Sequence, residues 1–143
     1  MLYEQDLFAW TQQQVNLLTH QRWHELDVEN LIDELEGMAR RDRREMINRL
    51  IILIAHLLKW KFQPDHQSGS WRGSIQEQRL QPNGLLEDSP SLHQQFIESL
   101  EKAYPQAVKL ASKETELPTT KFPNECPYEL AQLLDEDFLP STA

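Results

Sequence analysis

The chain has 143 residues, of which 39% are hydrophobic and 26% charged, a composition typical of one soluble globular domain. Its formal net charge of −9 repels nucleic acids and anionic membrane surfaces, which argues against a nucleic-acid partner. The single Cys126 cannot form an intramolecular disulfide, and no leader-like segment or bilayer-length apolar run is present. We therefore expect a cytoplasmic protein without a membrane partner.

The first sixty residues lack proline, and their apolar residues recur at helical spacing. This spacing predicts a first helix over residues 4–21. Asp27 is a typical N-cap, because its carboxylate can accept hydrogen bonds from the free amides of a first helical turn. A long second helix is therefore predicted from Val28 to about Lys61. Its apolar stripe includes Val28, Leu31, Ile32, Leu35 and Met38, and it resumes at Met46.

Proline and glycine punctuate the second half of the chain. A third helix is predicted over residues 71–81, ending at Pro82. Ser89 followed by proline predicts the start of a fourth helix over residues 90–102. Pro105 should separate this helix from a second piece over residues 106–116, because proline removes an internal amide donor and clashes with the preceding turn.

The C-terminal part, from about 117 to 143, is predicted to be a strap that crosses the surface of the helices. Residues 117–127 contain three prolines and no helical period, and Phe122 is expected to pin them. A short helix is predicted over residues 127–134. The predicted fold class is all-α, an antiparallel helical bundle with a long central helix, in a single domain covering residues 1–143.

Two groups of side chains have spacings that resemble metal sites. His20 and His24 stand four residues apart, but a helix boundary near them should spoil a shared face. Glu29, Asp33 and Glu36 share one helical face, yet no Glu-x-x-His motif accompanies them as in diiron bundles. A solvated acidic stripe near a helix N-terminus is the better interpretation, and we predict no metal and no cofactor.

His56 lies within the apolar run of the second helix, where a histidine could be a general base or a ligand. A neutral histidine with its hydrogen bonds satisfied in the core is the commoner case. No nucleophile with a paired base and no phosphate-binding loop can be assembled elsewhere. The leading interpretation is therefore non-enzymatic, with a metal-binding or enzymatic bundle around His56, helped by Glu29, Asp33 or His20, as the alternative.

The predicted central helix is divided by charge. Acidic residues occupy its first part, up to Glu36, and a basic block follows from Arg40 to Arg49, including Arg44. Some of these charges can pair at i, i+4 spacing within the helix. The unpaired arginines could meet an acidic segment of another protein, or a second copy of this chain in antiparallel orientation.

A second candidate surface surrounds the loop after the central helix. Trp60, Trp71, Arg72 and Arg79 cluster there, and tryptophan and arginine are enriched at interaction hot spots. The alternative is that the tryptophans fill the end of the bundle. The candidate binding surface predicted from the sequence comprises Trp60, Trp71, Arg72, Arg79, His56, Arg40 and Arg44.

An ordered set of short motifs resembles the largely cyanobacterial family catalogued as domain of unknown function number twenty-nine, along nearly the full chain. The matching segments are Leu2-Tyr3-Glu4-Gln5-Asp6, Glu25-Leu26-Asp27-Val28-Glu29-Asn30-Leu31, His56-Leu57-Leu58-Lys59-Trp60, Ser70-Trp71-Arg72, Gln78-Arg79, Ser89-Pro90-Ser91-Leu92, Phe122-Pro123, Cys126-Pro127-Tyr128 and Phe138-Leu139-Pro140. The resemblance implies a helical, stand-alone protein of cyanobacterial origin. It implies no particular activity.

Three functions thus compete. The leading hypothesis is a non-enzymatic protein-interaction module that binds another protein or itself through the charge-divided helix and the Trp71-Arg72 region. The first rival is the metal-binding or enzymatic bundle around His56. The second rival is a nucleic-acid-linked factor that uses the basic block from Arg40 to Arg49 together with Arg72.

Overall fold

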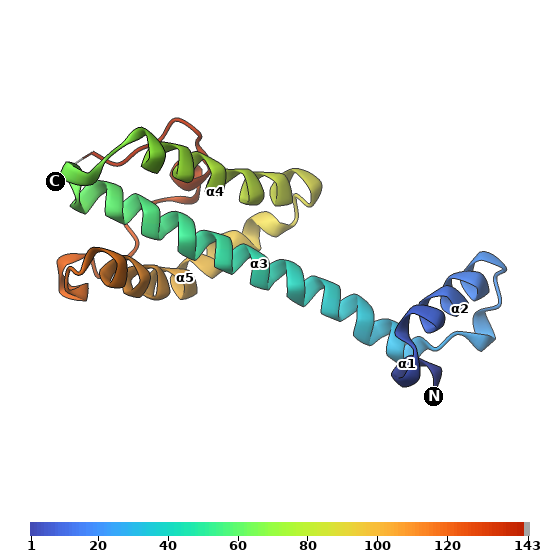
Figure 1. Cartoon of the computed structure of the whole chain (residues 1–143). Helices are drawn as coiled ribbons and strands as arrows, with labels where there is room; N and C mark the ends of the chain where they lie inside the picture. Colours follow the sequence, from blue (N-terminus) through green and yellow to red (C-terminus); the bar gives the residue numbers. More distant parts are fainter. Residues whose placement is uncertain (142–143) are drawn as a thin grey trace. The chain divides into compact units, whose positions relative to one another are not determined.

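The computed structural model describes residues 1–141, and in that range it contains helices, turns and extended segments but no strand. This confirms the predicted all-α class; positions 142 and 143 of the predicted strap lie outside the described residues. The α-helices are α1 (Leu2–Gln5), α2 (Leu7–Thr19), α3 (Val28–Phe62), α4 (Gly69–Asp88), α5 (Leu92–Thr115) and α6 (Leu130–Leu134) (Figure 1). Short 3-10 turns are η1 (Trp23–Glu25), η2 (Pro64–His66) and η3 (Thr119–Lys121).

The chain forms two compact units. Residues 1–42 make up the N-terminal unit, and the residues from 43 onward make up the C-terminal unit. Helix α3 contributes to both, because the boundary falls within it. Within the described part of the chain, none of the helices has an apolar stretch long enough to cross a bilayer. The single-domain organisation stays a prediction.

The predicted helix over residues 4–21 is wrong in its details, because Asp6 divides it into α1 and α2. The Asp6 side chain accepts a hydrogen bond from the Ala9 amide at 3.0 Å and so caps α2. A short carboxylate competes well for free backbone amides, which favours a new helix start at this position. At its other end α2 stops at Thr19, and Gln21 takes the left-handed conformation with φ 56°.

The interior of the N-terminal unit is small and partly polar. The Trp10 ring meets the Tyr3 ring edge to face at 4.8 Å, and its Nε1 donates to Asp27 Oδ2 at 2.9 Å. The Asp27 amide donates to Gln14 Oε1, and the Tyr3 hydroxyl donates to Glu34 Oε1 at 2.6 Å. Hydrogen bonds therefore attach α1 and α2 to Asp27, which precedes α3, and to Glu34 within α3.

The C-terminal unit has a larger and drier core. Figure 1 shows the second half of α3 running beside α4 and α5. The side chains of α3 that are fully buried are Met46, Leu50, Leu53, Ile54, Leu57 and Leu58. They form one cluster with Ile75 of α4, Phe96, Ala103 and Ala107 of α5, and Leu133 of α6. Burial of this many apolar side chains is the main source of stability in the unit.

Two predicted helix breaks are wrong, because both prolines lie inside continuous helices. Helix α4 begins at Gly69, capped by Ser68, and continues through Pro82 to Asp88. Helix α5 continues through Pro105 from Leu92 to Thr115. Proline costs a helix one hydrogen bond, but Pro82 itself is fully buried and Pro105 is flanked by buried residues. Core packing on both sides outweighs the local penalty.

The strap lies on the C-terminal unit and is largely extended, with one 3-10 turn at Thr119–Lys121. Phe122 is buried and meets the Phe62 ring edge to face at 5.3 Å, which confirms that it pins the strap. The last helix starts at Leu130 rather than at residue 127. Glu129 and Gln132 form a capping box there, so the local hydrogen bonds set the start.

Candidate functional site

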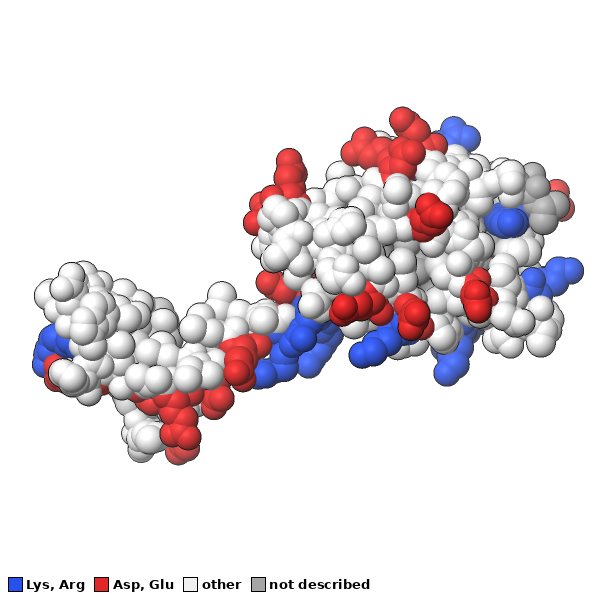
Figure 2. Space-filling model, turned by 180° about the vertical axis from the view of Figure 1, so that it is seen from behind, with Lys and Arg blue, Asp and Glu red and all other residues white. Residues whose placement is uncertain are grey.

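The charge division of α3 is present as predicted. Arg40 lies 3.8 Å from Glu36, and Arg49 lies 2.9 Å from Glu45, which confirms both i, i+4 pairs. Both side chains of the Arg40–Glu36 pair are exposed, so solvent screens their attraction. Arg44 is exposed, and within the described residues no carboxylate lies within 4.0 Å of it. Figure 2 shows the acidic group giving way to a basic group along this helix.

Aromatic rings and cations meet near the C-terminal end of α3. The Arg72 guanidinium lies 5.6 Å from the centroid of the buried Trp60 ring. The Lys59 ammonium lies 5.2 Å from the Trp71 ring and 2.6 Å from Glu114 Oε2. The two ring contacts are cation–π interactions, each of about 0.5–1 kcal/mol at an exposed site, whereas the contact of Lys59 with Glu114 is an ion pair. The structure thus places Arg72 beside Trp60 and Lys59 beside Trp71. A binding surface formed by these residues stays a prediction.

Arg79 does not take part in these cation–π contacts. Only 1% of its surface is accessible, and its Nε donates to the Leu133 carbonyl at 2.8 Å. Its other nitrogens donate to the Gln132 carbonyl at 3.3 Å and the Glu136 carbonyl at 3.4 Å. The Gln132 and Leu133 oxygens belong to the C-terminal end of α6, where carbonyls lack helical partners and the dipole favours a cation, and Glu136 follows two residues after the helix. Arg79 is therefore a buried cap that attaches α6 to α4.

The electrostatics of Arg79 agree with this structural role. Burial lowers the pKa of its guanidinium, while the charge of Asp135 acts in the opposite direction. Asn83, one turn later on α4, donates to the Leu134 carbonyl at 3.2 Å and so supports the same helix end. The side chains of Arg79 and Asn83 are thus engaged with the backbone of α6.

His56 is half-buried on α3. Burial is the main reason that its pKa lies below the usual value; Lys59 lowers the pKa further and Glu114 raises it. The partners proposed for it from the sequence, including His20 and Glu29, belong to the N-terminal unit, whereas His56 belongs to the C-terminal unit. In residues 1–141, no three metal-ligating side chains gather closely enough to hold an ion. The enzymatic alternative stays a prediction.

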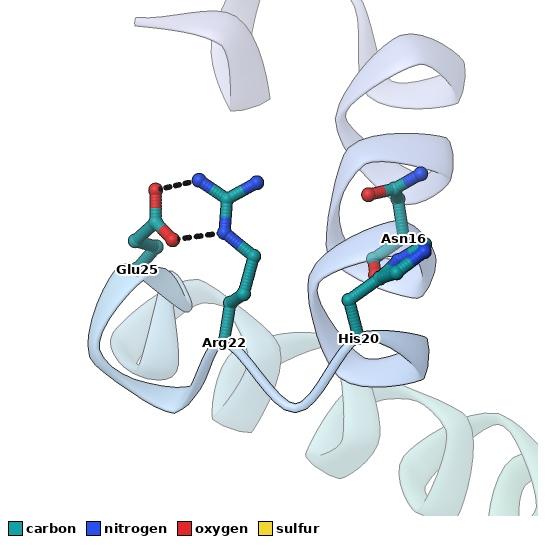
Figure 3. Close-up of polar contacts among 4 residues, drawn as sticks. All are labelled: Asn16, His20, Arg22 and Glu25. Atoms are coloured by element: carbon teal, nitrogen blue, oxygen red, sulfur yellow. Dashed lines mark hydrogen bonds and ion pairs between the residues drawn. The ribbon is translucent and has the colours of Figure 1, made fainter.

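His20 and His24 do not share a helix face. His20 follows the last residue of α2, and its ring Nδ1 lies 2.8 Å from the Asn16 carbonyl oxygen (Figure 3). His24 lies in the separate turn η1. Between them, Arg22 forms a bidentate ion pair with Glu25. The predicted helix boundary is confirmed, and this loop is held by local hydrogen bonds.

A cavity of about 480 Å³ lies between α5 and the strap, lined in part by Tyr104, Cys126 and Tyr128. The Tyr104 hydroxyl donates to the Pro123 carbonyl at 2.6 Å, and burial raises its pKa to about 12. Burial also raises the pKa of the Cys126 thiol and of the Tyr128 hydroxyl. Burial therefore favours the protonated form of all three groups.

The N-terminal unit exposes most of the apolar stripe identified in the sequence between Val28 and Met38. Val28, Ile32, Leu35 and Met38 of α3 are 54%, 49%, 64% and 54% exposed. Helix α2 exposes a second row, made up of Leu7, Phe8, Val15 and Leu18. Among described residues outside this unit, the large exposed hydrophobic side chains are Leu80 and Ile97. The length of chain available to cover this stripe could have predicted its exposure. The 27 residues before α3 form only one helix longer than about one turn, which is α2.

Comparison with known proteins bears on the family alone. No curated protein and no solved structure matches the chain. One family model, described as a domain of unknown function, matches residues 2–139 and so covers nearly all of the sequence. The resemblance drawn from the short motifs is thereby confirmed: the chain belongs to the DUF29 family.

Proposed function

We propose that this protein is a non-enzymatic protein-interaction module and that the exposed apolar surface of the N-terminal unit is its docking surface. The observation that carries the proposal is the concentration of large exposed hydrophobic side chains in residues 1–42. Single exposed hydrophobic residues are normal on any protein, but a larger apolar patch rimmed by polar residues is typical of an interaction site.

The way in which the N-terminal unit is built supports this role. Its three connected helices are attached by hydrogen bonds and capped at Asp6 and Asp27, so the unit does not need its exposed stripe for internal packing. Two exposed rows remain, one on α2 and one on α3. A partner that covers them gains about 25 cal/mol for each Å² of apolar surface removed from water.

The two rows differ in the charges beside them. Helix α2 has no charged residue between Leu7 and Thr19, so its row is rimmed by glutamine, asparagine and threonine. The row on α3 lies next to Glu29, Glu36 and Arg40. Charged rims set orientation and partner choice more than affinity. Specific recognition is therefore assigned to the α3 row.

Affinity capture from an extract of the cells that make the protein tests the proposal. The full chain is compared with Leu35→Glu, which places a charge in the docking surface, and with Leu80→Glu as the matched control. Leu35 and Leu80 are 64% and 63% exposed, so both variants should fold equally well. Partners, including the untagged chain, should be lost with Leu35→Glu and kept with Leu80→Glu. Identical capture by all three proteins would overturn the proposal.

A further inference from the structure

The exposed row on α3 has the spacing of a helix–helix seam. Val28, Ile32, Leu35 and Ala39 follow one another at intervals of four, three and four residues. At 3.6 residues per turn these positions fall within about 60° of one another around the helix axis. All four are exposed. Such a stripe of alternating three- and four-residue steps is the pattern with which one helix packs against another.

The charges beside this seam change sign along the helix. Glu29 and Glu36 lie on the same edge of the stripe as Arg40, because their positions fall about 80° to 120° from Val28. Arg40 contacts Glu36 across 3.8 Å within its own helix, and both side chains are more than half exposed. This edge of the helix is therefore acidic at its N-terminal end and basic at its C-terminal end.

We infer that the partner of this surface is a second copy of the chain, packed antiparallel along the Val28 to Ala39 seam. The inference rests on the proposed function and names its partner. In an antiparallel pair Val28 faces Ala39 of the other copy, and Ile32 faces Leu35. Glu29 then lies within about 3 Å, along the helix axis, of Arg40 of the other copy, and symmetry repeats the pair.

A parallel pair is disfavoured by the same charges. In a parallel pair the two-fold axis runs along the helices, so the edge that carries Glu29 and Arg40 faces the opposite edge of the other copy, and the contact between Glu29 and Arg40 is lost. A partner of unrelated sequence would need its own acidic-to-basic gradient to match this edge. The chain itself supplies that gradient, and the self-complementary arrangement satisfies both charges with one two-fold axis.

The charge pair gives the first test, made by light scattering on the full chain over a range of concentrations. Glu29→Arg and Arg40→Glu should each weaken the dimer about tenfold, since each creates two like-charge contacts. An equimolar mixture of the two variants should restore association, and so should the double variant Glu29→Arg/Arg40→Glu. Leu80→Glu should leave the mass unchanged. Single reversals without effect on association would overturn the antiparallel arrangement.

Cysteine cross-linking gives the orientation directly, in a Cys126→Ser background. Val28→Cys chains mixed with Ala39→Cys chains should form a mixed disulfide under mild oxidation. Homodisulfides of either variant should be minor, because residues 28 and 39 are about 16 Å apart along the helix. Predominant Val28→Cys homodisulfides would show a parallel pair and would overturn the inference.

Failure of the inference is distinguishable from failure of the proposed function. A wild-type chain that stays monomeric at every concentration overturns self-association. The same chain can then be tested for the loss of other partners in the Leu35→Glu capture experiment. If that loss is also absent, the docking surface itself is wrong.

Discussion

The two units of this protein treat the apolar stripe of α3 in opposite ways. In the C-terminal unit Leu53 is completely buried, with side chains of α4, α5 and α6 in the same core. In the N-terminal unit Leu35, at an equivalent position of the helical repeat, is 64% exposed. The helical periodicity of the sequence therefore predicts which face of a helix is apolar. Whether that face is buried depends on whether other helices pack against it.

The comparison can be tested most strongly by truncating one residue in each unit. Leu53→Ala should lower the free energy of unfolding by about 3 kcal/mol, because it removes buried methyl groups and leaves a cavity. Leu35→Ala should change it by less than about 0.5 kcal/mol. Urea unfolding at low protein concentration, where self-association contributes nothing, measures both. An equal cost for the two variants would contradict the assignment of Leu35 to the surface.

A smaller effect is expected where a charge is buried in the C-terminal unit. Arg79→Leu should cost about 2–3 kcal/mol, because two carbonyls at the end of α6 and the carbonyl of Glu136 after it lose their donor. Arg79→Lys should lose less, since it keeps the charge but not the forked geometry. Urea unfolding and amide exchange in α6 are the measurements.

The exposed Arg72→Leu provides the matched control for Arg79 and should cost under about 1 kcal/mol. If Arg79→Leu is as mild as Arg72→Leu, the attachment of α6 does not depend on this guanidinium. The result separates an arginine that holds the fold from an arginine available on the surface.

The smallest effect concerns the polar interior of the N-terminal unit. Hydrogen bonds from Asn30 and from Trp10 hold the pKa of Asp27 below its usual value. A lowered pKa means that the carboxylate stabilises the unit above the unfolded pKa of about 3.9 and that this contribution is lost as pH falls through the folded value. Asp27→Asn should speed amide exchange in residues 1–42 a few-fold at neutral pH.

Acid titration provides the check on Asp27. The wild-type N-terminal unit should lose protection below about pH 4, whereas the Asp27→Asn variant should lack that component. Asp33→Asn, a change at an exposed position on the same helix, serves as the control. An unchanged acid transition in Asp27→Asn would place the sensitive carboxylate elsewhere.

Local chemistry was readable from the sequence. The start of α3 at Val28 follows from the Asp27 cap, whose carboxylate accepts from the Asn30 amide. The length of α3 follows from an uninterrupted helical period, and the i, i+4 pair of Arg49 with Glu45 follows from spacing alone. Each depends on residues within one or two turns of one another.

The candidate site was only partly readable. The contact of Arg72 with Trp60 was predictable, because these residues flank a short connection between two helices. The position of Arg79 was not, because its partners lie more than fifty residues later in the chain. The exposure of the stripe from Val28 to Ala39 could not be predicted from its pattern either, since an exposed stripe and a buried stripe have the same sequence pattern.

The sequence by itself determined the helical class, the family, the charge division of α3 and the cap at Asp27, because these depend on composition and short-range hydrogen bonding. Tertiary structure alone decided that Pro82 and Pro105 stay inside helices, that Arg79 is buried, and that the stripe from Val28 to Ala39 is exposed. The physical reason is that burial depends on which distant segments are available to cover a face, and periodicity carries no record of them.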